Sequence, residues 1–157
     1  MFQIAFLLAF ITLAVLFLLA QQRILQVINL ENREMSPSSV WMQLIPVFGL
    51  VWQFFVVIRI ARSISKEMTA RMGESILDNT LVEIKETDDS PTYSIGLAYC
   101  ILMTVGITIN YSTMHSSSPG LLGFLFVLTG MVCWIIYWVR LVKMKNKIVG
   151  FSVAIAR

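Results

Sequence analysis

The chain has 157 residues, of which 57% are hydrophobic and only 13% are charged, and its mean hydropathy is +0.78. A soluble domain carries about 25% charged residues, so this composition excludes an ordinary soluble protein and indicates one that faces lipid. The net charge is +3, and we expect no nucleic acid among the partners.

Four apolar runs are long enough to cross a hydrocarbon core about 30 Å thick. They predict one all-α membrane domain, an integral membrane four-helix bundle. The expected spans are residues 2–20, 40–60, 94–112 and 121–141, with an acidic connection at 61–93 and a basic, then apolar tail at 142–157.

The first run, residues 2–20, also has the length of a signal peptide. However, no Lys or Arg precedes it, the apolar stretch exceeds a typical signal-peptide core, and Leu18-x-Ala20 is a poor cleavage site. We therefore expect an uncleaved first helix.

The second run is interrupted by Pro46 and Gly49. Proline removes a backbone donor and bends a helix, so we expect a kinked second span. Trp41 lies where an interfacial belt residue should lie, whereas Trp52 is deeper and is expected to pack inside the bundle.

The distribution of Lys and Arg gives the expected orientation. If all four runs cross the membrane, ten basic residues lie on the side of the termini and of the 61–93 connection. Only Arg23 and Arg33 then lie on the other side. Because Lys and Arg accumulate on the cytoplasmic side, both termini are expected in the cytoplasm.

The third run carries small residues at every fourth position, on one face of a helix. In lipid, such residues let helix backbones approach closely, and their hydroxyl groups bond across the contact. We expect a helix-packing seam, with a hydroxyl-lined pore or substrate path as the alternative; its members are Gly96, Cys100, Thr104, Thr108 and Ser112.

Gln53 is the amide that lies well inside a predicted span. Polar groups in a membrane are costly unless they have a partner, so Gln53 is expected to make an interhelical hydrogen bond, with a ligand role as the alternative. The centres of the spans hold no Asp, Glu or Lys, which argues against a proton-coupled carrier.

The residues that could carry chemistry are sparse. His115, the one histidine, stands beside Ser116–Ser118, but a catalytic base needs an orienting group, and only Glu31 and Glu34 are expected on that face. The cysteines, Cys100 and Cys133, have no metal spacing and are expected to be small apolar residues rather than a redox pair. We expect no catalytic residue, no cofactor and no metal.

The charged segments on the cytoplasmic side suggest two kinds of contact. Lys143, Lys145 and Lys147 are expected to contact anionic lipid headgroups. Residues 74–90 carry six acids and one lysine, and this acidic segment is then free for a protein partner.

Two stretches resemble a group of small uncharacterised bacterial membrane proteins, over about a third of the chain. The shared pattern is Asn-Arg and Pro before a Trp, then Ile-Pro-x-Phe and Trp, and a late Tyr-Trp followed by basic residues. The matching positions are Asn32, Arg33, Pro37, Trp41, Ile45, Pro46, Phe48, Trp52, Tyr137, Trp138 and Lys143. Gly49 departs from the pattern, where members often have Asn. The resemblance implies a four-span protein of the bacterial inner membrane and no particular activity.

These features favour a non-enzymatic integral membrane protein that acts by association, as an accessory or scaffolding subunit or as a homo-oligomer. Its partners would be the lipid bilayer and a membrane protein, or a second copy. One alternative is a small oligomeric channel or carrier, in which Gln53, Thr104 and Thr108 would converge on a hydrated cavity. Another is a membrane enzyme acting on lipid, with Glu31 or Glu34 near His115.

Overall fold

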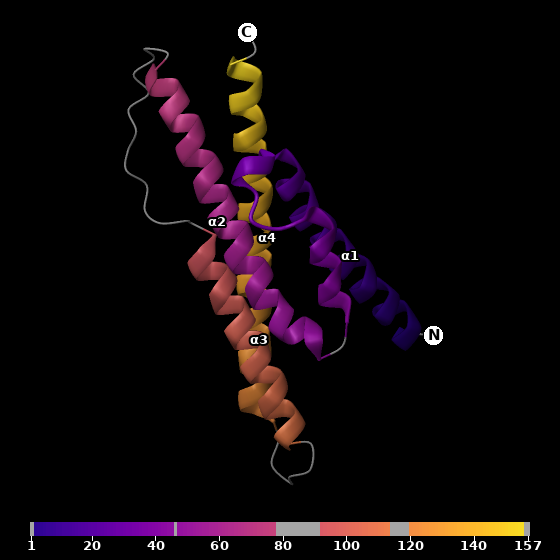
Figure 1. Cartoon of the computed structure of the whole chain (residues 1–157). Coiled ribbons are helices and arrows are strands. Elements are labelled where there is room, and N and C mark those ends of the chain that lie inside the picture. The colour runs from indigo at the N-terminus through magenta and orange to yellow at the C-terminus, as the bar shows by residue number, and fades with distance from the viewer. Residues whose placement is uncertain (1, 46, 78–91, 114–119, 156–157) are drawn as a thin grey trace.

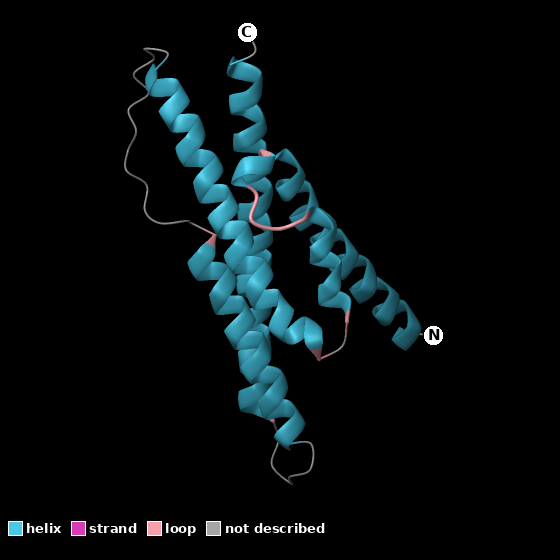
Figure 2. Ribbon diagram, viewed as in Figure 1, coloured by secondary structure: helices cyan, strands magenta, loops and turns pink. Residues whose placement is uncertain are grey.

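The computed structural model describes residues 2–45, 47–77, 92–113 and 120–155. Every regular element in these ranges is helical (Figure 2). The elements are α1 (Phe2–Val27), η1 (Leu30–Asn32), η2 (Pro37–Leu44), α2 (Phe48–Leu77), α3 (Tyr93–Thr113) and α4 (Leu121–Ile155), of which η1 and η2 are 3-10 helices. The four α-helices are long and apolar enough to cross a membrane, which confirms the all-α membrane class.

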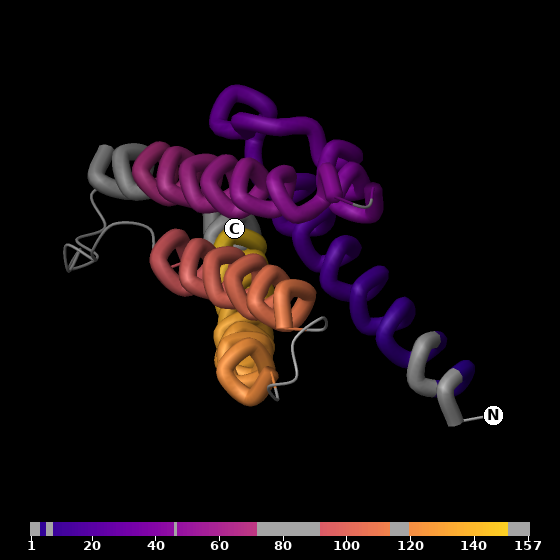
Figure 3. Tube along the Cα trace, turned by 90° about the horizontal axis from the view of Figure 1, so that it is seen from below, coloured from indigo at the N-terminus to yellow at the C-terminus, as the bar shows by residue number. Residues whose placement is uncertain are grey.

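The helices α3 and α4 form an antiparallel pair that lies side by side in both views (Figures 1 and 3). Glycines set their spacing: a Cβ added at Gly106 would lie 2.9 Å from the backbone nitrogen of Val127, and one at Gly123 would lie 3.0 Å from that of Asn110. Small residues permit this close approach of two backbones. The helix α4 does not end at 141 as expected but continues to Ile155, through the basic part of the tail.

The helix α1 slants away from the other helices toward its N-terminal end (Figures 1 and 3). It is held to the bundle by Phe17, which is buried among aromatic rings. The Phe17 ring centroid lies 5.1 Å from that of Trp134 and 6.1 Å from that of Tyr137. Beyond this contact α1 is apolar and mostly exposed, as expected of a helix surface that faces lipid.

The second apolar run is not the single kinked helix that we expected over residues 40–60. The 3-10 helix η2 ends at Leu44, Ile45 is extended (φ −74°, ψ 118°), and α2 begins at Phe48. The physical reason lies in the sequence, because a residue that precedes proline, as Ile45 precedes Pro46, is disfavoured in the helical region. Pro46 itself lies outside the described residues. Val47 then takes a left-handed conformation with φ 64°, which reverses the chain.

The result is a hairpin, formed by η2 and the first part of α2, whose two arms contact each other at three levels. The Glu34 backbone nitrogen donates to the Ser63 hydroxyl oxygen at 2.9 Å. The Trp52 indole nitrogen donates to the Ser39 carbonyl oxygen at 2.8 Å. Nearest the turn, a Cβ added at Gly49 would overlap the Gln43 carbonyl oxygen. Contacts at successive levels on either side of residue 46 define a reversal, whereas a kinked helix would continue forward.

This reversal corrects the alternation on which the expected orientation depended. The connection 28–36 lies beside residues 63–67 of α2, since Lys66 pairs with Glu34 at 2.7 Å and the Asn29 backbone nitrogen donates to Glu67 at 3.2 Å. Arg33 is therefore not separated from Lys66 by a membrane. Figure 1 shows α1, α2 and α4 all approaching one end of the molecule with their C-terminal parts. The expectation that both termini share a side loses its basis.

The hairpin turn should tolerate no side chain at residue 49. A Cβ at Gly49 meets backbone atoms of Gln43, which cannot rotate away as a side chain can. We expect Gly49→Ala to lower the free energy of unfolding by about 2 kcal/mol, as overpacking does. Thermal unfolding of the detergent-solubilised protein measures it. The matched control is Gly150→Ala, because a Cβ there meets nothing within 4 Å; equal stability of the two variants would contradict the hairpin geometry.

Candidate functional site

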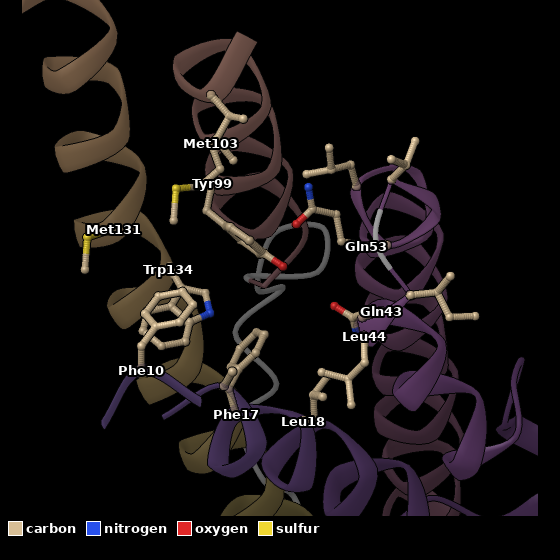
Figure 4. Close-up of a pocket in the computed structure, with 16 residues that line it drawn as sticks. Phe10, Phe17, Leu18, Gln43, Leu44, Gln53, Tyr99, Met103, Met131 and Trp134 are labelled. Atoms are coloured by element: carbon tan, nitrogen blue, oxygen red, sulfur yellow. The ribbon is translucent and has the colours of Figure 1, made fainter. Parts of the chain in front are cut away.

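An apolar pocket of about 350 Å³ lies between α1, the hairpin, α3 and α4. Its walls come from the five helices α1, η2, α2, α3 and α4 and from residues 45 and 47 between η2 and α2. The close-up shows their side chains around the pocket (Figure 4). The lining residues are Phe10, Ala14, Phe17, Leu18, Gln43, Leu44, Ile45, Val47, Gly49, Leu50, Gln53, Tyr99, Met103, Ile107, Met131 and Trp134. None of them is charged, and most are hydrocarbon or aromatic.

One side of the pocket is closed and the other is open. The closed side is formed by Phe17, Leu18 and Tyr99, which are all buried. The rim includes Val47 and Ile107, which are 80% and 45% exposed, along with other exposed apolar residues. The pocket therefore opens through an apolar rim, in a part of the molecule whose described residues carry no charge.

The amides of the pocket already have hydrogen-bond partners. The Gln43 amide nitrogen donates to the Gln21 side-chain oxygen at 2.6 Å and to the Val40 carbonyl at 3.2 Å. The Gln53 amide nitrogen donates to the Thr104 hydroxyl oxygen at 3.4 Å, a bond at the long limit. Gln53 thus links α2 to α3 as expected and also lines the pocket. Its amide group points inward in Figure 4.

A second cluster lies at the opposite end of the hairpin, around Glu67, whose side chain is fully buried. Its carboxylate accepts from the Asn29 backbone nitrogen at 3.2 Å and from the Asn32 amide at 2.7 Å. It also forms an ion pair with Arg71 at 2.7 Å. Arg71 in turn donates to the Ile148 carbonyl oxygen of α4 at 3.1 Å. We call this set the Glu67 network; it connects the 28–36 connection, α2 and α4.

The residues of the expected seam lie in two different environments. Gly96 and Cys100 are buried, and a Cβ on Gly96 would meet Val57 and Tyr137 of two neighbouring helices. Thr104 is half-buried, whereas Thr108 and Ser112 are exposed and bond carbonyls of their own helix at 2.8 and 3.0 Å. Gln53 and Thr104 meet, but Thr108 does not line the pocket.

The remaining sequence candidates lie outside the pocket. Lys143 and Lys147 are exposed on α4, and Lys145 is half-buried. His115 and Ser116–Ser118 lie outside the described residues, as do residues 78–91 of the acidic segment. The C-terminal end of α3 and the N-terminal end of α4, which flank His115 in the sequence, lie at the opposite end of the molecule from the C-terminal part of α2 (Figure 1). Glu34 pairs with Lys66 of α2 at 2.7 Å, so nothing described brings Glu34 toward those ends.

Several functional or structural residues escaped the sequence reasoning. Glu67 lies in the expected 61–93 connection, and its burial was not predicted, although the i, i+4 spacing from Glu67 to Arg71 is a recognised signal for an ion pair. Gln21 lies just past the expected first span, yet its side chain is fully buried and its amide nitrogen has no partner among the described residues. No local signal marks Gln21, since its burial comes from η2 folding back.

Comparisons with known protein families, with curated proteins and with solved structures find no match. The fold and the two clusters therefore rest on the physical chemistry of this chain alone, and the resemblance to small bacterial membrane proteins stays a prediction.

Removing the buried carboxylate should free the 28–36 connection. We expect Glu67→Gln to cost about 3 kcal/mol of unfolding free energy, because Arg71, only 11% exposed, loses the carboxylate with which it forms an ion pair. Chemical unfolding measures the loss, and faster proteolysis near residue 30 reports the released connection. The control Glu31→Gln removes an exposed carboxylate and should change neither. Equal behaviour of the two variants would show that the network does not hold the connection.

Proposed function

We propose that this chain is a non-enzymatic, multi-pass protein of the cytoplasmic membrane that acts by association. The end of the molecule that holds the Glu67 network, here called the charged end, lies in the cytoplasm. The observation that carries the proposal is the segregation of charge. Ten Lys and Arg lie in the described residues, and all belong to the chain segments that the Glu67 network connects or that adjoin it, at residues 21–36, 59–71 and 140–147: Arg23, Arg33, Arg59, Arg62, Lys66, Arg71, Arg140, Lys143, Lys145 and Lys147.

Charge at one end supports the orientation, because Lys and Arg accumulate on the cytoplasmic side of a membrane. The count expected for the whole chain was two against ten; among the described residues it becomes none against ten once the C-terminal part of α1 and the 28–36 connection join the charged end. With α1 crossing the bilayer, the N-terminus then lies on the outer side and the C-terminus in the cytoplasm. The resemblance to bacterial proteins would make this membrane the bacterial inner membrane.

The length of the hairpin arms fits an element that enters from the cytoplasmic side and turns back inside the bilayer. Eleven residues separate Phe48 from Arg59, about 16 Å at the rise of an α-helix. The eight residues of η2 cover a similar distance, about 16 Å at the rise of a 3-10 helix. Either arm thus reaches about half of a hydrocarbon core about 30 Å thick.

The charged end offers the surface for association. The Glu67 network holds it in one arrangement, and exposed basic side chains surround it, among them Arg62, Lys143 and Lys147. Anionic lipid headgroups attract such side chains, by about 1 kcal/mol for each Lys or Arg near the surface. Association with a membrane protein, or with a second copy, remains part of the proposal, and the acidic segment is the expected contact.

The orientation is tested by cysteine labelling in a chain whose Cys100 and Cys133 have been replaced by Ala. Under the proposal, Glu31→Cys is protected from a membrane-impermeant thiol reagent in intact cells and becomes reactive when the cells are permeabilised. Gln3→Cys and Ser117→Cys react in intact cells. Labelling of Glu31→Cys to the same extent as Ser117→Cys would restore four complete spans and reject the hairpin orientation.

The lipid contact is tested with single-charge variants. Lys147→Gln should weaken the binding of an anionic phospholipid by about 1 kcal/mol, measured by native mass spectrometry in detergent. Lys66→Gln removes the same charge but from a side chain already paired with Glu34 at 2.7 Å, so a smaller effect is expected. An equal loss in both variants would indicate only a response to net charge.

A further inference from the structure

We propose that the pocket between α1, the hairpin, α3 and α4 binds one hydrocarbon chain of a bilayer phospholipid. The inference goes beyond association at the charged end, and it depends on the chain lying in a membrane but not on which side is cytoplasmic. Three observations carry it: the depth of the pocket, the chemistry of its walls and its size.

The pocket lies at the level of the hydrocarbon. It surrounds the end of the hairpin that is farthest from the Glu67 network, where Gly49 and Gln43 meet. Because the hairpin reaches only about half of a hydrocarbon core, it leaves space beneath its turn that α1, α3 and α4 do not close. In a bilayer, the molecules available to fill an opening with an apolar rim are lipid chains.

The walls favour a pure hydrocarbon over a ligand with a polar group. The amide nitrogens of Gln43 and Gln53 already donate to Gln21 and Thr104. A polar ligand would find few groups to bond on walls that are almost entirely hydrocarbon and aromatic, and a buried polar group left without a partner is costly. A methylene chain has no group that needs a hydrogen bond. It would contact Phe10, Met103, Ile107 and Met131 along the walls.

The size suits a ligand of small-molecule dimensions. The pocket has a volume of roughly 350 Å³, and small-molecule pockets begin at about 300 Å³, so it has room for a slender chain.

The experiment uses the full-length protein reconstituted in bilayers that contain a phospholipid with a diazirine on one acyl chain. After illumination, peptide mass spectrometry locates the adducts. We expect adducts on the pocket residues Met103, Ile107 and Met131 to exceed, several-fold, those on Leu121, Leu122, Phe124 and Leu125 of α4, which are exposed and lie outside the pocket. Equal labelling of both regions would overturn the proposal.

A pair of variants on one helix sharpens the result. Ala14→Phe places a ring in the pocket and should reduce the pocket adducts several-fold, whereas Ala5→Phe, at an exposed position outside the pocket, should not. If Ala14→Phe fails to fold, Ala14→Leu applies the same test with less bulk. Pocket adducts that persist in the folded variant would overturn the proposal. So would labelling by a photoactivatable free fatty acid but not by the phospholipid, which would assign the pocket to another ligand.

Discussion

The structure depends on the contact between the buried Glu67 carboxylate and the connection that precedes the hairpin. Asn29 and Asn32 donate to it from one side and Arg71 pairs with it from the other. This contact fixes the end of α1 beside the middle of α2. Because the end of α1 and the middle of α2 are held side by side, the chain between them must run away from this contact and then turn back to it. The second apolar run therefore forms a hairpin, and the pocket forms around the turn of the hairpin.

A buried carboxylate is costly unless it is paired and hydrogen-bonded. Here each requirement is met, because one cation and two neutral donors surround Glu67. Arg71 also donates from Nη1, the guanidinium nitrogen that does not contact Glu67, to the Ile148 carbonyl oxygen of α4. Replacing one member would remove a hydrogen bond or the ion pair from the others inside the protein, which makes the set sensitive to single substitutions. The network therefore specifies one arrangement of three chain segments. Apolar contacts between helices discriminate little among alternative helix arrangements in a membrane, because lipid chains are as apolar as the side chains that they replace.

The membrane class and the presence of four apolar helices could be predicted from the sequence, because the length and hydropathy of a run are local properties. The hairpin could not. Pro46 is compatible both with a kink inside a span and with a turn between two arms, and the choice is made by distant partners, Gln21 for Gln43 and Glu34 for Ser63. The charge count depended on the same choice, since it assumed that every long apolar run crosses the membrane.

In the candidate site, too, local sequence features could be predicted and contacts between distant segments could not. Gln53 was predicted as an interhelical donor because a lone amide in a span needs a partner, and its bond to Thr104 agrees with that reasoning. No sequence signal predicted the pocket beside Gln53, because its walls come from segments that are far apart in the sequence. The fourfold spacing on α3 predicted a shared helix face but not its neighbours. Gly96 contacts Tyr137 of α4, but the close approach of the two backbones is made through Gly106, Gly123 and Gly130.

The central claim, that the hairpin returns to the end of the molecule from which it started, is tested most directly by a distance measurement in lipid nanodiscs. Spin labels would be placed at Leu30, at Arg62 and at Tyr111, all exposed positions, and pulsed electron paramagnetic resonance would measure the pairwise distances. The hairpin predicts that Leu30 lies closer to Arg62 than to Tyr111 by an amount on the order of 20 Å. A Leu30 label that lies close to Tyr111 and far from Arg62 would mean that the second run crosses the membrane, and would contradict the claim.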